Sequence, residues 1–263
     1  MRGLPLGTLA ASRLGSHPWS DGYPARPPDV EELERLCSFA QEERRIDHFV
    51  ARLNGRWAQR DEALNELRVG LCFKALDYRI VAWEPLGNNA KRGEFSITHN
   101  GEDLFFVEVK SPGWEGELDQ KERRAGRKKQ PKYRPGEGRR GPNATWPHVR
   151  TCITKAYPKF LPHFNNLLVI ADDFRVPLDD LNMELALYNP HLSPALSEFG
   201  CSEYELGCFA SNAFENIGSV ARFNNELLSS RNYFGDCYRL YTYANPFALK
   251  QFPNDLWKPQ ARS

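Results

Sequence analysis

The chain has 263 residues, of which 41% are hydrophobic, 26% charged and 12% aromatic. This composition is typical of a soluble globular protein, and the length allows one large domain with a substantial core. No apolar run approaches the roughly 18 residues of a membrane-spanning helix, which argues against a membrane protein. The first 15 residues carry only short apolar pieces, so we expect no signal peptide. The six cysteines include no CxxC pair, which predicts reduced core cysteines in a cytoplasmic protein.

Charge is distributed unevenly along the chain, although the net charge is only +1. Residues 121–140, "KERRAGRKKQPKYRPGEGRR", contain ten Lys or Arg and two Glu. The rest of the chain holds 25 basic and 32 acidic residues and is therefore acidic overall. One strongly basic segment on an acidic body indicates a contact with an anionic partner.

The N-terminal half is predicted to contain an arm, two helices and three strands. Residues 1–29 are rich in Pro, Gly and Ser, which favours an extended or mobile arm. Asp29 is a candidate N-cap for a helix that starts at Val30. Asn100-Gly101 is a specific hairpin signal between the second and third strands. The expected elements are helices over about 30–54 and 57–76 and strands at 79–83, 94–98 and 103–110.

The second half begins with the basic segment and then returns to regular structure. Pro158 kinks or ends a helix predicted over 148–161. Residues 165–173, "NNLLVIADD", form a continuous apolar run, as in strands buried on both faces. The order of helix, three strands, helix and strand predicts an α/β fold with helices around a central sheet. In the tail we expect a helix at 178–188 and strands at 216–223 and 237–245. The predicted divisions are an arm at 1–29, an N-terminal helix at 30–56, and a main domain at 57–263 with a basic loop at 111–147.

The third strand carries two charges in an otherwise apolar sequence, "DLFFVEVK". Strand side chains alternate between faces, so Glu108 and Lys110 point the same way and Val107 and Val109 the other. Charges on a buried strand cost several kcal/mol unless a partner or a metal compensates them. This cost is the first indication of a functional site.

Glu66 on the second helix, Glu94 after Arg92-Gly93 and the Glu108-Val109-Lys110 tripeptide occur in a specific order. Together with "NELRVGLCFKALDYRIVAWEP" and "ITKAYPKF", this set resembles the PD-(D/E)xK nuclease superfamily, which has a restriction-endonuclease-like fold. The resemblance covers about residues 60–172. It departs from the usual pattern in having Glu94 where Asp is more common and Gly93 where Pro is more common.

The resemblance implies roles for individual residues. Glu66, Glu94 and Glu108 would surround one or two Mg²⁺ (or Mn²⁺) ions, with the Val109 carbonyl as a further ligand. Glu62, four residues before Glu66 on the same helical face, is a rival for the helix position. Lys110 would be the motif lysine, and Lys155 matches a helix position that often carries a polar or basic residue.

The chemistry of these residue types fits phosphodiester hydrolysis on its own grounds. Mg²⁺ prefers hard oxygen ligands from carboxylates and keeps several waters, and it can both neutralise a phosphate and activate a water. A nearby ammonium such as Lys110 can orient that water and stabilise developing negative charge.

The basic segment is expected to contact nucleic acid, for which we expect DNA. So many cations would bind a phosphate backbone with salt-sensitive, largely sequence-independent affinity. Tyr133 and Trp146 could stack on bases or simply pack. The expected contacts are Arg123, Arg124, Arg127, Lys128, Lys129, Lys132, Arg134, Arg139 and Arg140, together with Lys155.

Three functions stay open from the sequence. The first is a metal-dependent endonuclease, and the second is a nucleic-acid-binding module that keeps the fold without the chemistry. The third is a subunit that uses the basic loop as a docking arm. A homodimer or another protein partner is compatible with each of them.

Overall fold

The protein is described from a computed structural model, which divides the chain into two compact units. Unit 1 comprises the described residues up to Leu71, and unit 2 those from Cys72 onward. Helix α4 contributes to both units. The structure describes residues 7–16, 18, 28–55, 57–99, 101, 103–111, 146–171, 178–188, 207–225 and 238–251.

Unit 1 is helical, and its first helix lies within the segment predicted to be an extended arm. The backbone N–H groups of Leu9 and Ala10, in the first turn of α1, donate to the Glu34 carboxylate at 2.9 and 2.8 Å. A carboxylate at a helix N-terminus satisfies unpaired N–H groups and complements the helix dipole. The helices of the unit are α1 (Thr8–Leu14), α2 (Val30–Glu42), α3 (Ile46–Leu53) and the first part of α4 (Trp57–Ala75).

The helix expected over about 30–54 is in fact two helices, so this prediction is wrong in its length. Its start is confirmed, because the Asp29 side chain accepts a hydrogen bond from the Glu32 N–H at 2.8 Å. The break comes at Arg44, whose φ of 57° lies in the left-handed region. One residue in that conformation ends a helix, a position that glycine usually occupies.

A buried ion pair joins α2 and α4 inside unit 1. Arg68 donates to the two carboxylate oxygens of Glu32 at 2.7 and 2.9 Å, and both side chains are 3% exposed. Such a pair compensates the cost of burying two charges only because its geometry is bidentate.

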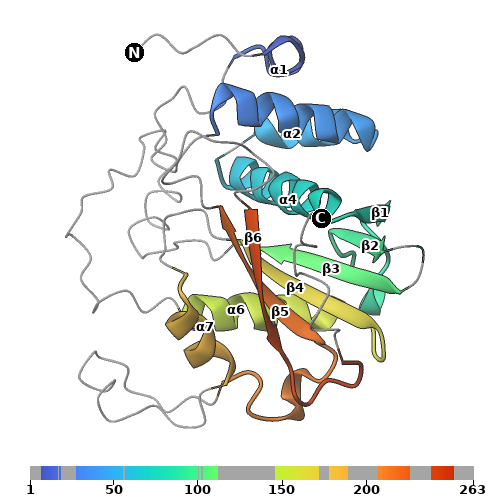
Figure 1. Cartoon of the computed structure of the whole chain (residues 1–263), viewed down its shortest axis with the longest axis vertical. Coiled ribbons are helices and arrows are strands. Elements are labelled where there is room, and N and C mark those ends of the chain that lie inside the picture. Colours follow the sequence, from blue (N-terminus) through green and yellow to red (C-terminus); the bar gives the residue numbers. More distant parts are fainter. Residues whose placement is uncertain are drawn as a thin grey trace, which may run out of the picture. The chain divides into compact units, whose positions relative to one another are not determined.

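Unit 2 is built on one six-stranded mixed sheet with the strand order β1-β2-β3-β4-β5-β6 (Figure 1). Strand β2 is antiparallel to both of its neighbours, β1 and β3, while β3, β4 and β5 are parallel and β6 is antiparallel to β5. All six lie where the sequence predicts strands, which confirms the α/β class. Their bounds are β1 Tyr78–Trp83, β2 Phe95–His99, β3 Leu104–Lys110, β4 Asn165–Ala171, β5 Ser219–Asn225 and β6 Tyr238–Ala244.

The crossover from β3 to β4 contains the helix α6 (Trp146–Ala156) and a 3₁₀ turn, η2 (Tyr157–Lys159). The helix predicted over 148–161 therefore ends earlier than expected. Pro158 explains the end, because proline has no N–H to continue the α-helical hydrogen-bond ladder. Unit 2 also contains α7 (Asp180–Leu187) and the 3₁₀ turns η1 (Asn88–Ala90) and η3 (Asn212–Phe214).

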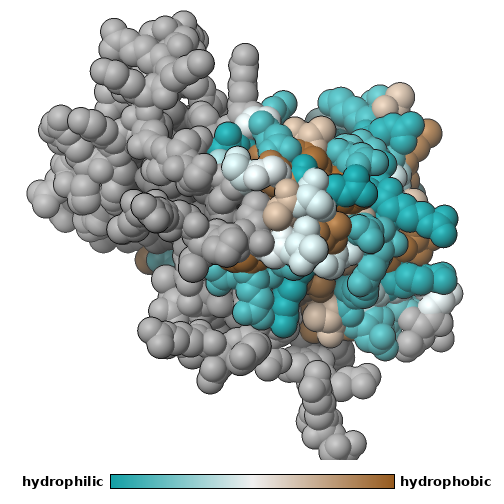
Figure 2. All heavy atoms as spheres, turned by 90° about the horizontal axis from the view of Figure 1, so that it is seen from above, coloured by the Kyte–Doolittle hydropathy of each residue, from teal (hydrophilic) through white to brown (hydrophobic). Residues whose placement is uncertain are grey.

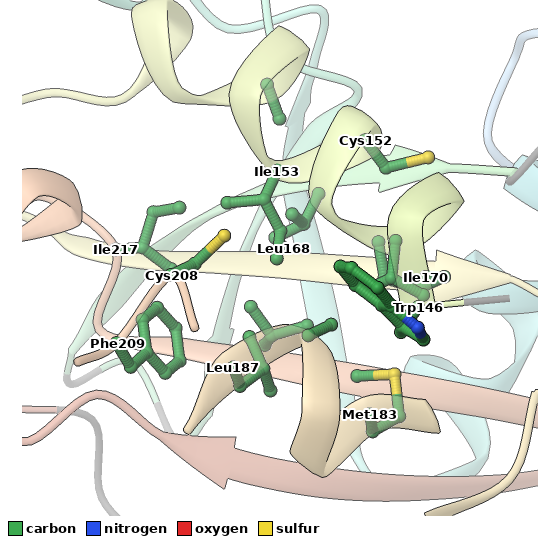
Figure 3. Packing of buried hydrophobic residues seen from close by; sticks show 14 of the residues in the cluster. Trp146, Cys152, Ile153, Leu168, Ile170, Met183, Leu187, Cys208, Phe209 and Ile217 are labelled. Atoms are coloured by element: carbon green, nitrogen blue, oxygen red, sulfur yellow. The ribbon is translucent and has the colours of Figure 1, made fainter. Parts of the chain in front are cut away.

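Helices α6 and α7 pack on one face of the sheet (Figures 1 and 3). In Figure 3, Ile153 of α6 points to Leu168 of β4, while Cys152 lies at the margin of the cluster. Phe106 of β3 belongs to the same cluster, so this face is the one on which Glu108 and Lys110 also lie. The site is therefore expected at the border of this core.

The last turn of α4 packs on the opposite face. The ring of Phe73 makes edge contacts with Tyr78 and Phe95, and Tyr78 in turn contacts Phe105. Every residue of β4 is buried, as the apolar run in its sequence predicts.

Within the described residues, no helix is long and apolar enough to cross a membrane. The face shown in Figure 2 is largely hydrophilic over these residues, with hydrophobic side chains between. Some large apolar side chains are exposed, among them Leu86 (63%) and Leu181 (61%).

Candidate functional site

Four charged side chains of unit 2 meet beside strands β2 and β3. Glu108 and Lys110 lie at the C-terminal end of β3, and Glu94 directly precedes β2. Because β2 and β3 are antiparallel, with Phe95 opposite Val107, the start of one strand adjoins the end of the other. The fourth side chain, Lys159, comes from η2 after α6. The crossover between the parallel strands β3 and β4 thus places Lys159 next to Glu94 and Glu108.

Each ammonium group contacts both carboxylates. Lys110 Nζ is 2.5 Å from Glu108 Oε1 and 3.7 Å from Glu94 Oε1. Lys159 Nζ lies 2.5 Å from the same Glu108 oxygen and 3.8 Å from Glu94 Oε1. The four groups are therefore one electrostatic cluster, which we call the Glu–Lys cluster.

Burial within the cluster is graded. The Glu108 side chain is fully buried, Glu94 is 19% exposed, and Lys159 and Lys110 are 20% and 26% exposed. A buried carboxylate is stable only with cationic partners, which both lysines provide. Their partial exposure means that the ammonium groups border solvent, where an anionic ligand can reach them.

Glu108 keeps binding capacity that its ion pairs do not use. Both of its oxygens are buried without a hydrogen-bond partner among the described residues, so the two lysine contacts are close ion pairs without hydrogen-bond geometry. Both contacts involve Oε1. A buried carboxylate with an unsatisfied oxygen is unusual and calls for a ligand or an ion.

Two glycines set the backbone around the cluster. A Cβ on Gly93 would come within 2.4 Å of the Phe106 ring, and the Gly93 N–H donates to the Pro85 carbonyl at 3.1 Å. Proline at this position would lack the N–H and meet the ring. The structure therefore gives a local packing reason for glycine, and not proline, before Glu94.

Gly87 packs closely against the backbone of Lys159. A Cβ on Gly87 would lie 2.3 Å from the Lys159 carbonyl oxygen and 2.9 Å from the Phe106 ring. Real Cβ atoms do not approach that closely, so only glycine fits without movement. The segment before β2 consequently fixes the backbone of η2 that carries Lys159.

Lys159 was missed by the sequence reasoning, which assigned the helix position to Lys155. Lys155 is exposed on α6, and the lysine that pairs with both carboxylates follows it by one turn. The available signal was Pro158, since the chain leaves the helix there and the next side chain changes direction. Lys155 still contributes charge nearby: burial raises the pKa of Cys152 to about 11, while the Lys110 and Lys155 ammonium groups act to lower it.

Glu66 belongs to unit 1, where Arg52 of α3 binds both of its carboxylate oxygens. The rival Glu62 is exposed on the same helix. Over the described ranges, no group of three or more His, Cys, Asp or Glu side chains is placed to hold a metal ion. A three-carboxylate metal site that includes Glu66 thus stays a prediction, as does ligation by the carbonyl of Val109, a buried residue of β3.

The cations of the basic segment, from Arg123 to Arg140, lie outside the described residues. Of the two aromatic residues considered for base stacking, Tyr133 also lies outside them. Trp146 is 7% exposed and belongs to the core under α6, so it packs.

Comparison with known proteins adds no further assignment: no protein-family model, no curated protein and no solved structure matches this chain.

Proposed function

We propose that this chain is a Mg²⁺-dependent nuclease with a restriction-endonuclease-like fold, and that its substrate is DNA. The observation that carries the proposal is the Glu–Lys cluster, in which Glu94, Glu108 and Lys110 meet beside two antiparallel strands. The resemblance to PD-(D/E)xK nucleases rests on Glu66, Glu94, Glu108 and Lys110 in sequence order, and the last three of these meet in the cluster. Their spatial proximity supports it, because separate surface carboxylates would not need to converge.

The order of helices and strands along the chain supports the proposed restriction-endonuclease-like fold. Helix α4, strands β1, β2 and β3, helix α6 and strand β4 follow one another over the region of the resemblance. The site residues lie on this framework and the rest of the sheet, β5 and β6, extends it.

Glu94 and Glu108 suit a divalent metal. Mg²⁺ is commonly bound through one or two carboxylates with waters and substrate phosphate filling the remaining positions. The unsatisfied Glu108 oxygens would be ligands of this kind, and Glu94 would supply the second carboxylate. When bound, Mg²⁺ would polarise the phosphate and make a water nucleophilic at neutral pH.

The residues of the chain supply the remaining requirements of hydrolysis. Water attacks the phosphorus, the bond to the leaving oxygen breaks, and negative charge accumulates on the non-bridging oxygens. Lys110 and Lys159 contact the Glu108 carboxylate, and their side chains are partly exposed. Their ammonium groups would donate hydrogen bonds to the non-bridging phosphate oxygens or to the attacking water. Burial of Glu108 keeps these interactions in a region of low dielectric, where they are stronger than in water.

The direct test is incubation of the purified protein with supercoiled plasmid DNA, in parallel in Mg²⁺, Mn²⁺ and EDTA. The isosteric Glu108→Gln variant removes the buried negative charge, and Lys155→Ala is a control that removes an exposed cation outside the ion pairs. We expect metal-dependent cleavage by the wild type and the control, and none by Glu108→Gln with its fold intact by circular dichroism. Structured RNA in the same assay identifies the substrate.

One observation favours a second candidate, a nucleic-acid-binding module without hydrolytic activity. Each carboxylate considered for metal binding has a cationic neighbour, with Arg52 on Glu66 and two lysines on Glu108. If these pairs are permanent, the acids are structural. Salt-sensitive DNA binding without cleavage, equal in wild type and Glu108→Gln, would establish this alternative.

A further inference from the structure

The segment between β1 and β2 forms a small ribbon next to the Glu–Lys cluster. The Glu84 N–H donates to the Glu94 carbonyl at 2.9 Å, and Leu86 forms an antiparallel bridge with Arg92. The Gly87 N–H donates to the Lys91 carbonyl at 2.7 Å and closes the turn. Residues 84–94 are therefore a two-stranded ribbon that ends at the site residue Glu94.

The base of this ribbon is anchored and its tip is exposed. Gly87 and Gly93 are buried against the Phe106 ring, and Gly87 also abuts the Lys159 carbonyl. Residues 89–92, by contrast, are exposed. Asn89 has φ 54° and Ala90 φ 56°, which defines a tight turn. A structure fixed at its base beside two site residues holds its tip at a constant distance from the cluster.

The exposed tip has the chemistry of a nucleic-acid contact. Lys91 and Arg92 are adjacent exposed cations, and the Arg92 guanidinium donates to the Glu84 carbonyl at 2.7 Å, which orients it. Asn89 is exposed and carries an amide, and the apolar side chain of Leu86 is 63% exposed. Cations position a protein on phosphates, amides can read base edges, and a two-stranded ribbon fits the major groove of B-DNA.

We propose that the ribbon 84–94 is a DNA-contacting element that binds the duplex beside the scissile phosphate through Lys91 and Arg92. The position beside a cleaved phosphate rests on the proposed function, whereas binding of DNA by the ribbon does not require hydrolysis. It also differs from the contact expected of residues 121–140, because the ribbon is made of described residues of unit 2 beside the Glu–Lys cluster. Its rigid link to Gly87 and Lys159 sets the register of the bound strand relative to the cluster.

The test measures binding, so that it remains informative without cleavage. A short fluorescein-labelled DNA duplex is titrated with the Glu108→Gln protein in EDTA at several salt concentrations, and its anisotropy gives the dissociation constant. The double variant Lys91→Ala/Arg92→Ala is made in that background. Its matched control, Lys74→Ala/Arg79→Ala, removes the same two residue types from exposed positions, one in the last turn of α4 and one at the start of β1.

Each phosphate contact contributes about 0.9 to the slope of log affinity against log salt. We expect the ribbon variant to weaken binding about tenfold or more and to lower that slope by about two, with the control unchanged. An unchanged slope in the ribbon variant, or an equal reduction in the control, would overturn the proposal. Absence of binding by the parent protein would overturn it as well. Failure of the nuclease proposal shows separately, as a wild-type protein that binds the duplex but does not cut plasmid.

Discussion

Lys159 Nζ lies 2.5 Å from Glu108 Oε1, although the two residues come from opposite ends of the β3–α6–β4 crossover. Glu108 is fully buried, and Lys159 adds a second cation to the one that Lys110 of the same strand already provides. The pair therefore connects fold and site: it stabilises the crossover and places a second ammonium group beside the proposed phosphate position.

The first prediction is that Glu108 and Lys159 are energetically coupled. Lys159→Met leaves the buried carboxylate with Lys110 alone and should reduce the free energy of unfolding by about 2–4 kcal/mol. In a Glu108→Gln background the same substitution should cost much less, giving a coupling energy of about 1–3 kcal/mol. Urea unfolding of the four proteins measures this cycle. Additive effects would show that the ion pair contributes nothing to stability.

The second prediction concerns which helix-side lysine acts on the substrate. Lys159→Ala should lower kcat for DNA cleavage about 100- to 1,000-fold, the range for removing one donor to developing negative charge. Lys155→Ala should affect mainly KM, because its exposed ammonium can contribute only to general attraction of the phosphate backbone. Steady-state kinetics at fixed Mg²⁺ separates these effects. A larger fall in kcat for Lys155→Ala would restore the assignment made from the sequence.

A third prediction follows from the close approach of Gly87 to η2. Gly87→Ala must displace the Lys159 backbone or the Phe106 ring, and it should destabilise unit 2 by about 1–3 kcal/mol. It should also lower activity more than its loss of stability explains, because it moves Lys159. The comparison variant is Gly93→Ala, whose Cβ would have three atoms of the Phe106 ring as its nearest neighbours. Combining Gly93→Ala with Phe106→Leu should recover stability, whereas Phe106→Leu should not rescue the activity of Gly87→Ala. Equal rescue of both would contradict the role of Gly87.

The fourth prediction compares how much the buried ion pair of unit 1 and an exposed ion pair contribute to the free energy of unfolding. Arg68→Met removes the bidentate partner of the buried Glu32 carboxylate and should cost about 3–5 kcal/mol. Arg35→Met removes a surface pair with Glu31 at 3.7 Å and should change stability by less than about 0.5 kcal/mol. Thermal unfolding of the two variants tests the contrast. The double variant Glu32→Leu/Arg68→Met should recover most of the loss, which a merely local packing defect would not show.

The fifth prediction concerns alkaline pH. Burial raises the pKa of the Cys152 thiol from about 9 to about 11, so the folded state keeps its proton while the unfolded state loses it. Stability conferred by this group is therefore complete below pH 9 and is lost as the pH rises to 11. Cys152→Ala should make the fall in stability over this range shallower, by up to about 1.4 kcal/mol per pH unit. The exposed neighbouring variant Thr154→Ala should follow the wild type, and an identical slope for Cys152→Ala would refute the assignment.

The strands of unit 2 were predictable because each depends on a local pattern. The apolar run in "NNLLVIADD" predicts a strand buried on both faces, and every residue of β4 is buried. Glu108 and Lys110 were identifiable because two charges interrupt such a pattern. The ends of the helices were less predictable. The chain turns at Arg44, which has a left-handed φ although it is not a glycine, so the sequence carries no signal for this turn.

Partners distant in the sequence could not be predicted in the same way. Pairing of Lys159 with Glu108 depends on where α6 ends, next to Pro158. The length of the helix, and not the local conformational preference of Lys159, therefore decides where its side chain lies. The same holds for Arg52, whose bidentate contact with Glu66 depends on the break between α2 and α3. Sequence order therefore indicated which carboxylates to consider, and tertiary structure determined which cations lie on them.

The most direct test of the central claim is a single-turnover comparison of plasmid cleavage in Mn²⁺ by variants inside and outside the Glu–Lys cluster. Glu94→Ala, Glu108→Gln, Lys110→Ala and Lys159→Ala should each abolish or severely reduce the rate constant. Glu62→Ala and Lys155→Ala, which change exposed residues, should stay within a few-fold of the wild type. Loss of wild-type cleavage in EDTA, and return of the same pattern of variants when Mn²⁺ is added back, would establish a metal-dependent nuclease centred on these four residues. Cleavage that survives in Glu108→Gln, or that is absent from the wild type, would contradict the account.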